Sequence, residues 1–219
     1  MLAMDRTRVP DSGPKLKLVI AAEELFARYG LEAVSVRDVT KQAGMNIASV
    51  NYHFGSRDGL VAAVMQRHLV PLYEERLVRA KAVERNFGTL AAPLEACAEA
   101  WLRPVLELAG RAAMPEELAL KLLGRLCGAH DTDVPPPVDV AAKAAHARFQ
   151  RVLAKAAPGL SGDDLGWRLQ FVEDVWCRAL VRGPTVSAEA LYDRLARFAV
   201  AGWGGGGAKG DSPQATFDF

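Results

Sequence analysis

Residues 44–60 read GMNIASVNYHFGSRDGL and place five hydrogen-bonding side chains within eight positions, between two glycines that can each end a helix. The five are Asn46, Ser49, Asn51, Tyr52 and His53, and Ile47 and Ala48 lie among them. Such polar side chains are short or planar and can donate and accept hydrogen bonds, while isoleucine or alanine can touch a thymine methyl. The stretch therefore favours contact with the major groove of DNA. The alternative is a short polar helix that connects two larger ones.

Catalytic chemistry has little support in the chain. Carboxylates stand next to each other at several places, among them Glu23 with Glu24, Glu116 with Glu117, and Asp163 with Asp164. Adjacent side chains on a helix diverge by about 100° and cannot share a site. The HDTD stretch at 130–133 lies beside a proline run and is expected to be a solvated turn. No phosphate-binding loop, nucleophile elbow or zinc spacing is present. We therefore expect no enzyme activity, no cofactor and no metal.

The composition indicates a globular chain with one or two cores. Half of its 219 residues are apolar, and the formal net charge is +1, so nucleic-acid binding must come from a local surface. No apolar run of about 18 residues is present, and no apolar segment follows the first basic residues. We expect a cytoplasmic protein without a membrane partner. The cysteines, at 97, 127 and 177, are odd in number and far apart, which predicts buried thiols.

Helix signals recur along the chain, and sustained strand alternation does not. Pro14 and Gly30 bound a first helix, and Ser35 with Asp38 forms a capping pattern for a second helix that Gly44 ends. A third helix is expected at 47–54, with Val50 and Phe54 facing inward. The short turn that contains a glycine predicts a helix-turn-helix.

A fourth helix is expected from Ser56 towards Lys81, kinked at Pro71. Later helical segments are 90–110, 115–129, 138–157, 163–182 and 187–202, with a loop at 131–137. The predicted fold is all-α with about nine helices. Its divisions are a disordered tail at 1–13, a DNA-binding domain at 14–60, a ligand-binding and dimerisation domain at 61–202, and a disordered tail at 203–219.

Three segments near the amino end, AAEELFARYG, SVRDVTKQAG and NYHFGSRDGL, resemble the DNA-binding domain of the tetracycline-repressor (TetR) family of bacterial transcription regulators. The resemblance implies contacts from the second and third helices and from the start of the fourth. Arg37 and Thr40 would reach backbone or base, Ser49 would lie in the base-contacting turn, Tyr52 and His53 would clamp phosphates, and Arg57 would add a phosphate contact. Many members carry Lys at position 47 and Tyr at position 51, where this chain has Ile47 and Asn51.

Three of these side chains also have plainer interpretations. His53 could be a capped surface histidine, Tyr52 could pack beneath the first helix, and Asn51 could be a solvated helix residue. The sequence leaves these alternatives open.

The resemblance also implies that the larger domain binds a small effector and dimerises. The side chains expected to line the effector pocket are Trp101, Val105, Leu118, Leu122, Phe149 and Trp176, and the polar groups that could fix a ligand are Arg103, Arg125, His146 and Arg178. Two apolar rows, Leu165, Leu169, Val172, Trp176 and Leu180, then Leu191, Leu195, Phe198 and Val200, are expected to contact a second copy; a core role is the alternative.

Three further segments, FGSRDGLVAAVMQRHLVPL, LKLLGRLCG and AAPGLSGDDLGWRLQFVEDVWCRAL, resemble the subset of that family that responds to fatty acids or acyl-CoA thioesters. The predicted function is a repressor that binds a near-palindromic double-stranded DNA operator as a homodimer. A small apolar or amphipathic effector would release it. The alternative is a helical adaptor that binds protein rather than a specific DNA sequence.

Overall fold

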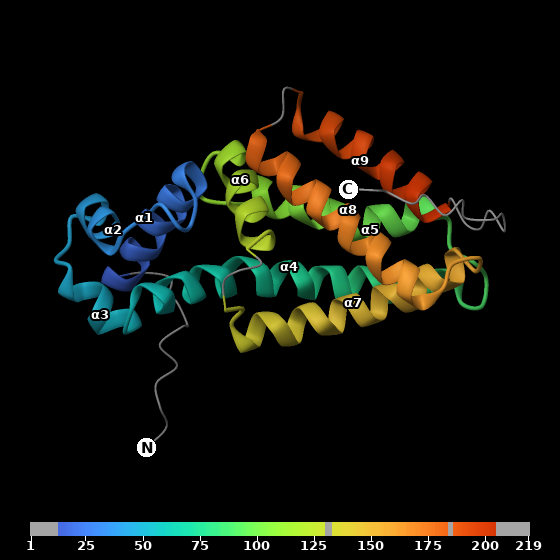
Figure 1. The fold of residues 1–219 in the computed structure, drawn as a ribbon, viewed down its shortest axis with the longest axis horizontal. Helices are drawn as coiled ribbons and strands as arrows, with labels where there is room; N and C mark the ends of the chain where they lie inside the picture. The colour runs from blue at the N-terminus through green and yellow to red at the C-terminus, as the bar shows by residue number, and fades with distance from the viewer. Residues whose placement is uncertain (1–12, 130–132, 184–185, 205–219) are drawn as a thin grey trace, which may run out of the picture.

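The computed structural model describes residues 13–129, 133–183 and 186–204, and these form nine helices with no strand (Figure 1). The helices are α1 (Pro14–Tyr29), α2 (Val36–Ala43), α3 (Ala48–Phe54), α4 (Arg57–Phe87), α5 (Leu94–Gly110), α6 (Glu116–Cys127), α7 (Pro136–Ala156), α8 (Gly162–Arg182) and α9 (Ala188–Gly204). The all-α prediction is confirmed. Residues 1–12 and 205–219, where tails were predicted, lie outside the described residues.

The first three helices form a small head at one end of the molecule (Figure 1). Pro14 begins α1, where its missing N–H costs no hydrogen bond, and Gly30 follows α1 at φ 95°. Val50 and Phe54 of α3 are buried together with Phe26 of α1. Apolar burial therefore holds the three helices as one unit, and their bounds match the predicted ones.

The long helix α4 begins at the head and crosses into the body, where it packs along α7 and against α5 (Figure 1). It continues through Pro71 and ends at Phe87, six residues beyond the predicted end at Lys81. Gly88 at φ 56° follows it. The head and the body thus share one continuous helix.

The body contains α5 to α9, and three predicted boundaries there need correction. Helix α5 begins at Leu94, four residues after the predicted start at 90. The loop predicted at 131–137 ends earlier, because Pro136 and Pro137 form the first turn of α7, where a proline N–H is not needed. The tail predicted from 203 begins too early, because α9 runs to Gly204 and Trp203 is fully buried. The Trp203 ring lies 5.7 Å from that of Phe149. In the part of the chain described, no helix has the length and apolar character needed to cross a membrane.

A charged cluster lies at the centre of the body. Arg76 of α4 is 1% exposed, and its Nη1 lies 2.6 Å from Glu173 Oε1 of α8. Its Nε donates to the Trp101 carbonyl of α5 at 3.0 Å, and its guanidinium lies 4.3 Å from the centre of the Trp101 ring. His146 of α7 contacts the other Glu173 oxygen at 3.1 Å. Four helices therefore meet at one buried ion pair.

The arginine decides the charge state of Glu173. Burial by itself would raise the pKa of this carboxyl, but the charge of Arg76 and the hydrogen bond from His146 outweigh burial and lower the pKa to about 2. The charge of Glu173 in turn keeps the pKa of Arg76 raised despite complete burial. Both partners are thus ionised at neutral pH, and each compensates the burial cost of the other.

Candidate nucleic-acid interface

Helix α2 begins with a complete capping box. Ser35 Oγ accepts from the Asp38 N–H at 3.3 Å, and Asp38 Oδ2 accepts from the Ser35 N–H at 2.9 Å. Hydrogen bonds from the Ser35 side chain and then its backbone lower the pKa of Asp38. At the other end, Gly44 takes the left-handed conformation at φ 65°, and the Met45 N–H donates to Thr40. These local contacts produce the predicted turn between α2 and α3.

Helix α3 has one buried face and one exposed face. Val50 and Phe54 are buried, as the spacing predicts. Tyr52 is 79% exposed and Asn51 is exposed beside it, so neither packs beneath α1. The remaining predicted contact residues lie around the same helix, with Ile47 and Ala48 exposed and Ser49 and His53 half-buried. The exposed face contains no charged side chain.

Asn46 has a structural role that the sequence did not indicate. Its Oδ1 accepts from the Ala48 N–H at 2.9 Å, so the side chain caps the first turn of α3. His53 contacts the Tyr52 ring edge at 4.9 Å between centroids. Lys15 of α1 lies 5.4 Å from the Phe54 ring and brings a positive charge near the end of α3.

The joint between α3 and α4 explains the glycines and serine of the FGSRDG stretch. Gly55 follows α3 at φ 81°, and Ser56 Oγ accepts from the Gly59 N–H at 3.0 Å to cap α4. A Cβ added at Gly59 would lie 2.1 Å from the Phe54 carbonyl oxygen. Gly59 is therefore required for the close approach of the two helices, which fixes α3 against the rest of the head.

Two of the predicted contact residues, Thr40 and Arg57, bind backbone carbonyls of the protein itself. Thr40 is 4% exposed, and its hydroxyl donates to the Arg37 carbonyl at 3.2 Å, so it offers almost no surface to DNA. Arg57 Nε donates to the Val34 carbonyl at 3.0 Å, and its Nη2 donates to Leu31. The geometry therefore does not support the predicted backbone or base contact of Thr40 or the predicted phosphate contact of Arg57. Arg37, by contrast, is exposed on α2.

Side-chain contacts connect the head to its neighbours in ways that the sequence did not reveal. Gln42 of α2 donates to Glu24 of α1 at 2.8 Å. The buried Glu23 carboxylate accepts from His68 Nε2 at 2.8 Å and lies 3.1 Å from Arg67 Nε, so α1 is also tied to α4. These partners are up to 45 residues apart, so no local sequence pattern could predict that they pair.

Most of the side chains predicted to line an effector pocket are packed in the core. Five are at most 1% exposed: Trp101, Val105, Leu122, Phe149 and Trp176. The Trp101 and Phe149 rings lie 4.6 Å apart, so two residues of this set do meet, but as core. Leu118 differs because it lines an open cleft of about 580 Å³ beside α1. The sequence could not separate pocket residues from core residues, because large apolar side chains fill the interior as readily as they line a pocket.

The predicted polar ligand contacts also divide into two groups. Arg103 is paired with Glu189 at 2.6 Å, and His146 belongs to the buried charged cluster. Arg125 and Arg178 instead line a cleft of about 740 Å³ between the head, α6 and α8. In the described residues, histidine, cysteine, aspartate and glutamate side chains do not gather in groups of three that could hold a metal ion.

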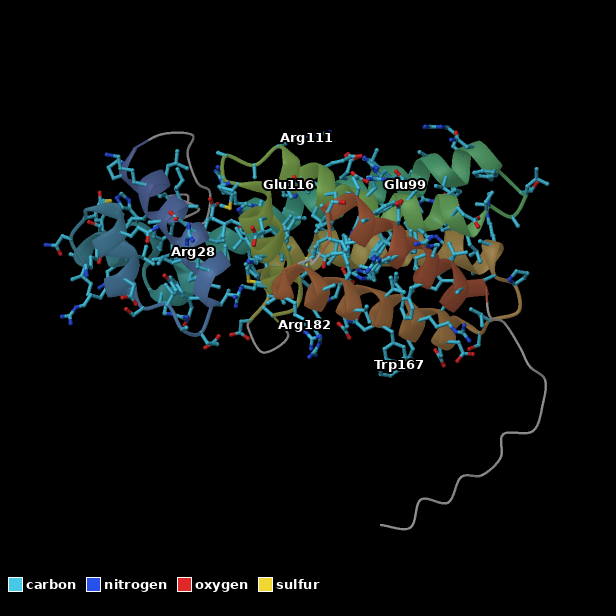
Figure 2. The ribbon with its side chains drawn as sticks, turned by 90° about the horizontal axis from the view of Figure 1, so that it is seen from above. Arg28, Glu99, Arg111, Glu116, Trp167 and Arg182 are labelled. Carbon is cyan, nitrogen blue, oxygen red and sulfur yellow. The ribbon has the colours of Figure 1, made fainter. Side chains whose placement is uncertain are left out.

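The apolar rows predicted to meet a second copy mostly face the protein's own core. Leu165, Leu169, Val172, Trp176, Leu180 and Leu195 are buried, and Leu191 and Val200 are partly buried. Phe198 alone of these rows is exposed. A different row of α8 faces outward, with Trp167 at 64% and Phe171 at 56% exposure and Val175 one turn further on. Figure 2 shows Trp167 projecting away from the body.

Comparison with known proteins agrees with this arrangement. Residues 18–64 match the family model described as bacterial regulatory proteins, tetR family, and residues 99–202 match the tetracyclin repressor-like C-terminal domain. A 74-residue segment is 36% identical to the HTH-type transcriptional dual regulator CecR of Shigella flexneri and covers 34% of this chain and 33% of CecR. A 62-residue segment is 36% identical to the HTH-type transcriptional repressor KstR2 of Rhodococcus jostii and covers 28% and 30% of the two chains. The chain thus spans about a third of the length of these curated relatives.

Solved structures share the whole fold at low sequence identity. The fatty acid degradation regulator FadR from Bacillus halodurans superposes with a TM-score of 0.56 at 10% identity, over 89% of this chain and 98% of that one. AmtR of Mycobacterium smegmatis superposes with a TM-score of 0.56 at 20% identity, over 91% and 90%. Both family models match, one over the head and one over the body. The chain belongs to the tetR family of bacterial regulatory proteins.

Proposed function

We propose that this protein is a ligand-responsive transcriptional regulator, a repressor that binds a near-palindromic DNA operator as a homodimer. The observation that carries the proposal is the exposed, uncharged face of α3, held outward by the capped α2 and by the glycine joint to α4. Its side chains can donate and accept hydrogen bonds as base edges and phosphates require. The names of the relatives CecR and KstR2, a transcriptional regulator and a repressor, agree with this function.

In this proposal α3 lies in the major groove. Asn51 and Ser49 form hydrogen bonds with base edges, and Ile47 and Ala48 contact thymine methyls. Tyr52 and His53 contact phosphates. Positive charge comes from neighbouring elements, because α3 has none, and Arg37, exposed on α2, supplies part of it. Sequence recognition therefore depends mainly on shape and hydrogen bonding.

The second copy is proposed to pack on the outer row of α8 and on α9. Trp167, Phe171 and Val175 recur every four residues along α8, and the Trp167 and Phe171 rings lie 5.9 Å apart. Phe198 adds an exposed aromatic side chain on α9. Exposed apolar side chains in a row are typical of interaction sites. A two-fold pair would present two heads to half-sites about one turn, ~34 Å, apart.

The effector is proposed to be a small apolar or amphipathic molecule, with a fatty acid or an acyl-CoA thioester as the first candidates. It would bind the body and shift the head, which is tied to α4 through Glu23 and His68. A cytoplasmic location follows from operator binding.

Selection from a pool of random duplexes tests the proposed function. The purified protein should enrich one sequence with two-fold symmetry and half-sites about one turn apart. Enrichment of no sequence, together with capture of a protein partner, would favour the adaptor alternative. Enrichment of a single unsymmetrical site would contradict the homodimer.

A further inference from the structure

A cleft lies where the head meets the body. Its volume is about 740 Å³, and its walls are the loop after α1, the end of α6 and the second half of α8. Gly124 in its lining allows α6 to pack closely on α8, because a Cβ added there would lie 2.7 Å from the Cys177 carbonyl oxygen. Leu31, Ala129 and Val181 give the cleft an apolar lining.

Arg125 of α6 lines this cleft and has hydrogen-bonding capacity left over. Its Nη2 donates to the Arg28 carbonyl at 3.3 Å, but its Nε is buried and has no hydrogen-bond partner among the described residues. Buried donors in proteins are almost always paired. An acceptor bound in the cleft would pair with Nε only after the guanidinium turns towards it, because Nε is closed off from solvent.

Arg178 of α8 provides a second guanidinium on another wall of the same cleft. It is exposed, and its side chain makes no hydrogen bond or ion pair within the residues described. Two arginines from different helices suit a carboxylate, whose two oxygens can accept from both.

Two carboxylates share the lining and limit the charge of a ligand. Glu32 lies on the loop after α1, and Asp174 lies one turn before Arg178 and accepts from Gln170 at 3.0 Å. Among the described residues of the lining, these carboxylates stand beside the two arginines and oppose the binding of a polyanion. A single negative charge placed between Arg125 and Arg178 is compatible with this balance.

We propose that this cleft is the effector site and takes a free monocarboxylate on an apolar chain rather than its CoA thioester. The inference rests on the proposed function, which requires an effector, and adds its location and its charge. The apolar chain lies along Leu31, Ala129 and Val181, while the carboxylate lies between the two guanidiniums.

The position of Arg125 also supplies a route to the head. Its Nη2 bonds to the last turn of α1, and a Cβ added at Gly30 would lie 2.6 Å from its Nη1. A carboxylate that draws this guanidinium into the cleft therefore weakens its contact with the end of α1. The head then changes its position relative to α6.

Titration calorimetry with decanoate, decanol and decanoyl-CoA tests the site directly, without DNA. Decanoate should bind the parent protein at least about tenfold more tightly than either of the other two. Arg178→Gln should weaken decanoate binding by about tenfold or more. Arg182→Gln, which makes the same charge change on an exposed residue of α8 outside the cleft, should not. Ala129→Trp should block binding by filling the cleft.

Several results would overturn the inference. These are no decanoate binding, equal affinity for decanol, tighter binding of decanoyl-CoA, or unchanged decanoate affinity in Arg178→Gln. Light scattering on each variant controls for a change of oligomeric state, because Arg178 follows the exposed Val175 by one turn. If decanoate binds as predicted but the protein binds no DNA, the proposed carboxylate site is supported and the proposed regulatory function is contradicted.

Discussion

Arg57, at the start of α4, and Arg37, on α2, differ in what their guanidinium groups contact. Arg57 directs its guanidinium at the carbonyls of Leu31 and Val34, so it joins the first turn of α4 to the loop after α1. Arg37 lies exposed on α2, and its side chain makes no hydrogen bond in the part of the chain described. One positive charge therefore stabilises the head, and the other is available to a phosphate.

Replacing each of these arginines with alanine should separate the two roles. Arg57→Ala is expected to lower the free energy of unfolding by about 2 kcal/mol, because two carbonyls lose a charged donor. Arg37→Ala should change that free energy by less than about 0.5 kcal/mol. It should instead reduce the salt dependence of DNA binding by about one phosphate contact. Urea titration and binding at several salt concentrations measure both quantities; the reverse pattern would contradict the assignment.

Contacts between near neighbours could be predicted from the sequence, and contacts between distant residues could not. The Ser35–Asp38 capping box spans three positions, so spacing alone identified it. The carbonyl partners of Arg57 lie 23 and 26 residues earlier in the chain, and nothing in the local pattern points to them. The outward face of α3 was predictable because Val50 and Phe54 fix which side is inward.

At the scale of helices, α8 presents two apolar faces. The row that contains Leu169 and Trp176 is buried in the body, while Trp167 and Phe171 point outward. Both rows have helical spacing, so the sequence could not tell which one packs inside. Helix ends were more predictable, because caps and glycines signal them locally. The end of α4 was missed because the first such signal is Gly88.

The outer row of α8 should determine the oligomeric state. Phe171→Glu is expected to convert a dimer to a monomer, because a buried charge without a partner opposes association. Val140→Glu provides the control, since Val140 is also an exposed apolar residue but lies on α7. Light scattering coupled to size-exclusion chromatography gives the mass of each variant. A parent monomer, or a dimeric Phe171→Glu variant, would refute this interface.

At the scale of the whole molecule, the buried pair of Arg76 and Glu173 joins α4 to α8, and His146 and Trp101 extend it to α7 and α5. The head is tied to this framework through α4 at His68 and through α6 at Arg125. The sequence could predict the helices but not this cluster, because its members lie up to 97 residues apart.

The buried pair makes a specific prediction about pH. Glu173→Gln should lower the free energy of unfolding at pH 7 by about 3 kcal/mol, because it leaves Arg76 without a counter-charge. The folded pKa of Glu173 lies near 2, below its ordinary value of 4.5, so its contribution is present above pH 4.5 and is lost as pH falls towards 2. The difference between parent and variant should therefore shrink over that range.

Urea titrations at a series of pH values measure this difference. Glu74→Gln is the control, because Glu74 is exposed on the same helix as Arg76. A difference between the parent and Glu173→Gln that stays constant from pH 4.5 to pH 2 would show that Glu173 is not ionised in the folded protein.

The exposed face of α3 is expected to contact DNA, and fluorescence anisotropy on the selected duplex tests this contact most directly. Tyr52→Ala should weaken binding by about tenfold or more at matched salt, with no change in thermal unfolding, because Tyr52 is exposed and supports no core contact. Tyr29→Ala removes another exposed tyrosine of the head, outside α3, and should bind as the parent does. Equal affinity of the Tyr52→Ala variant and the parent would contradict the account.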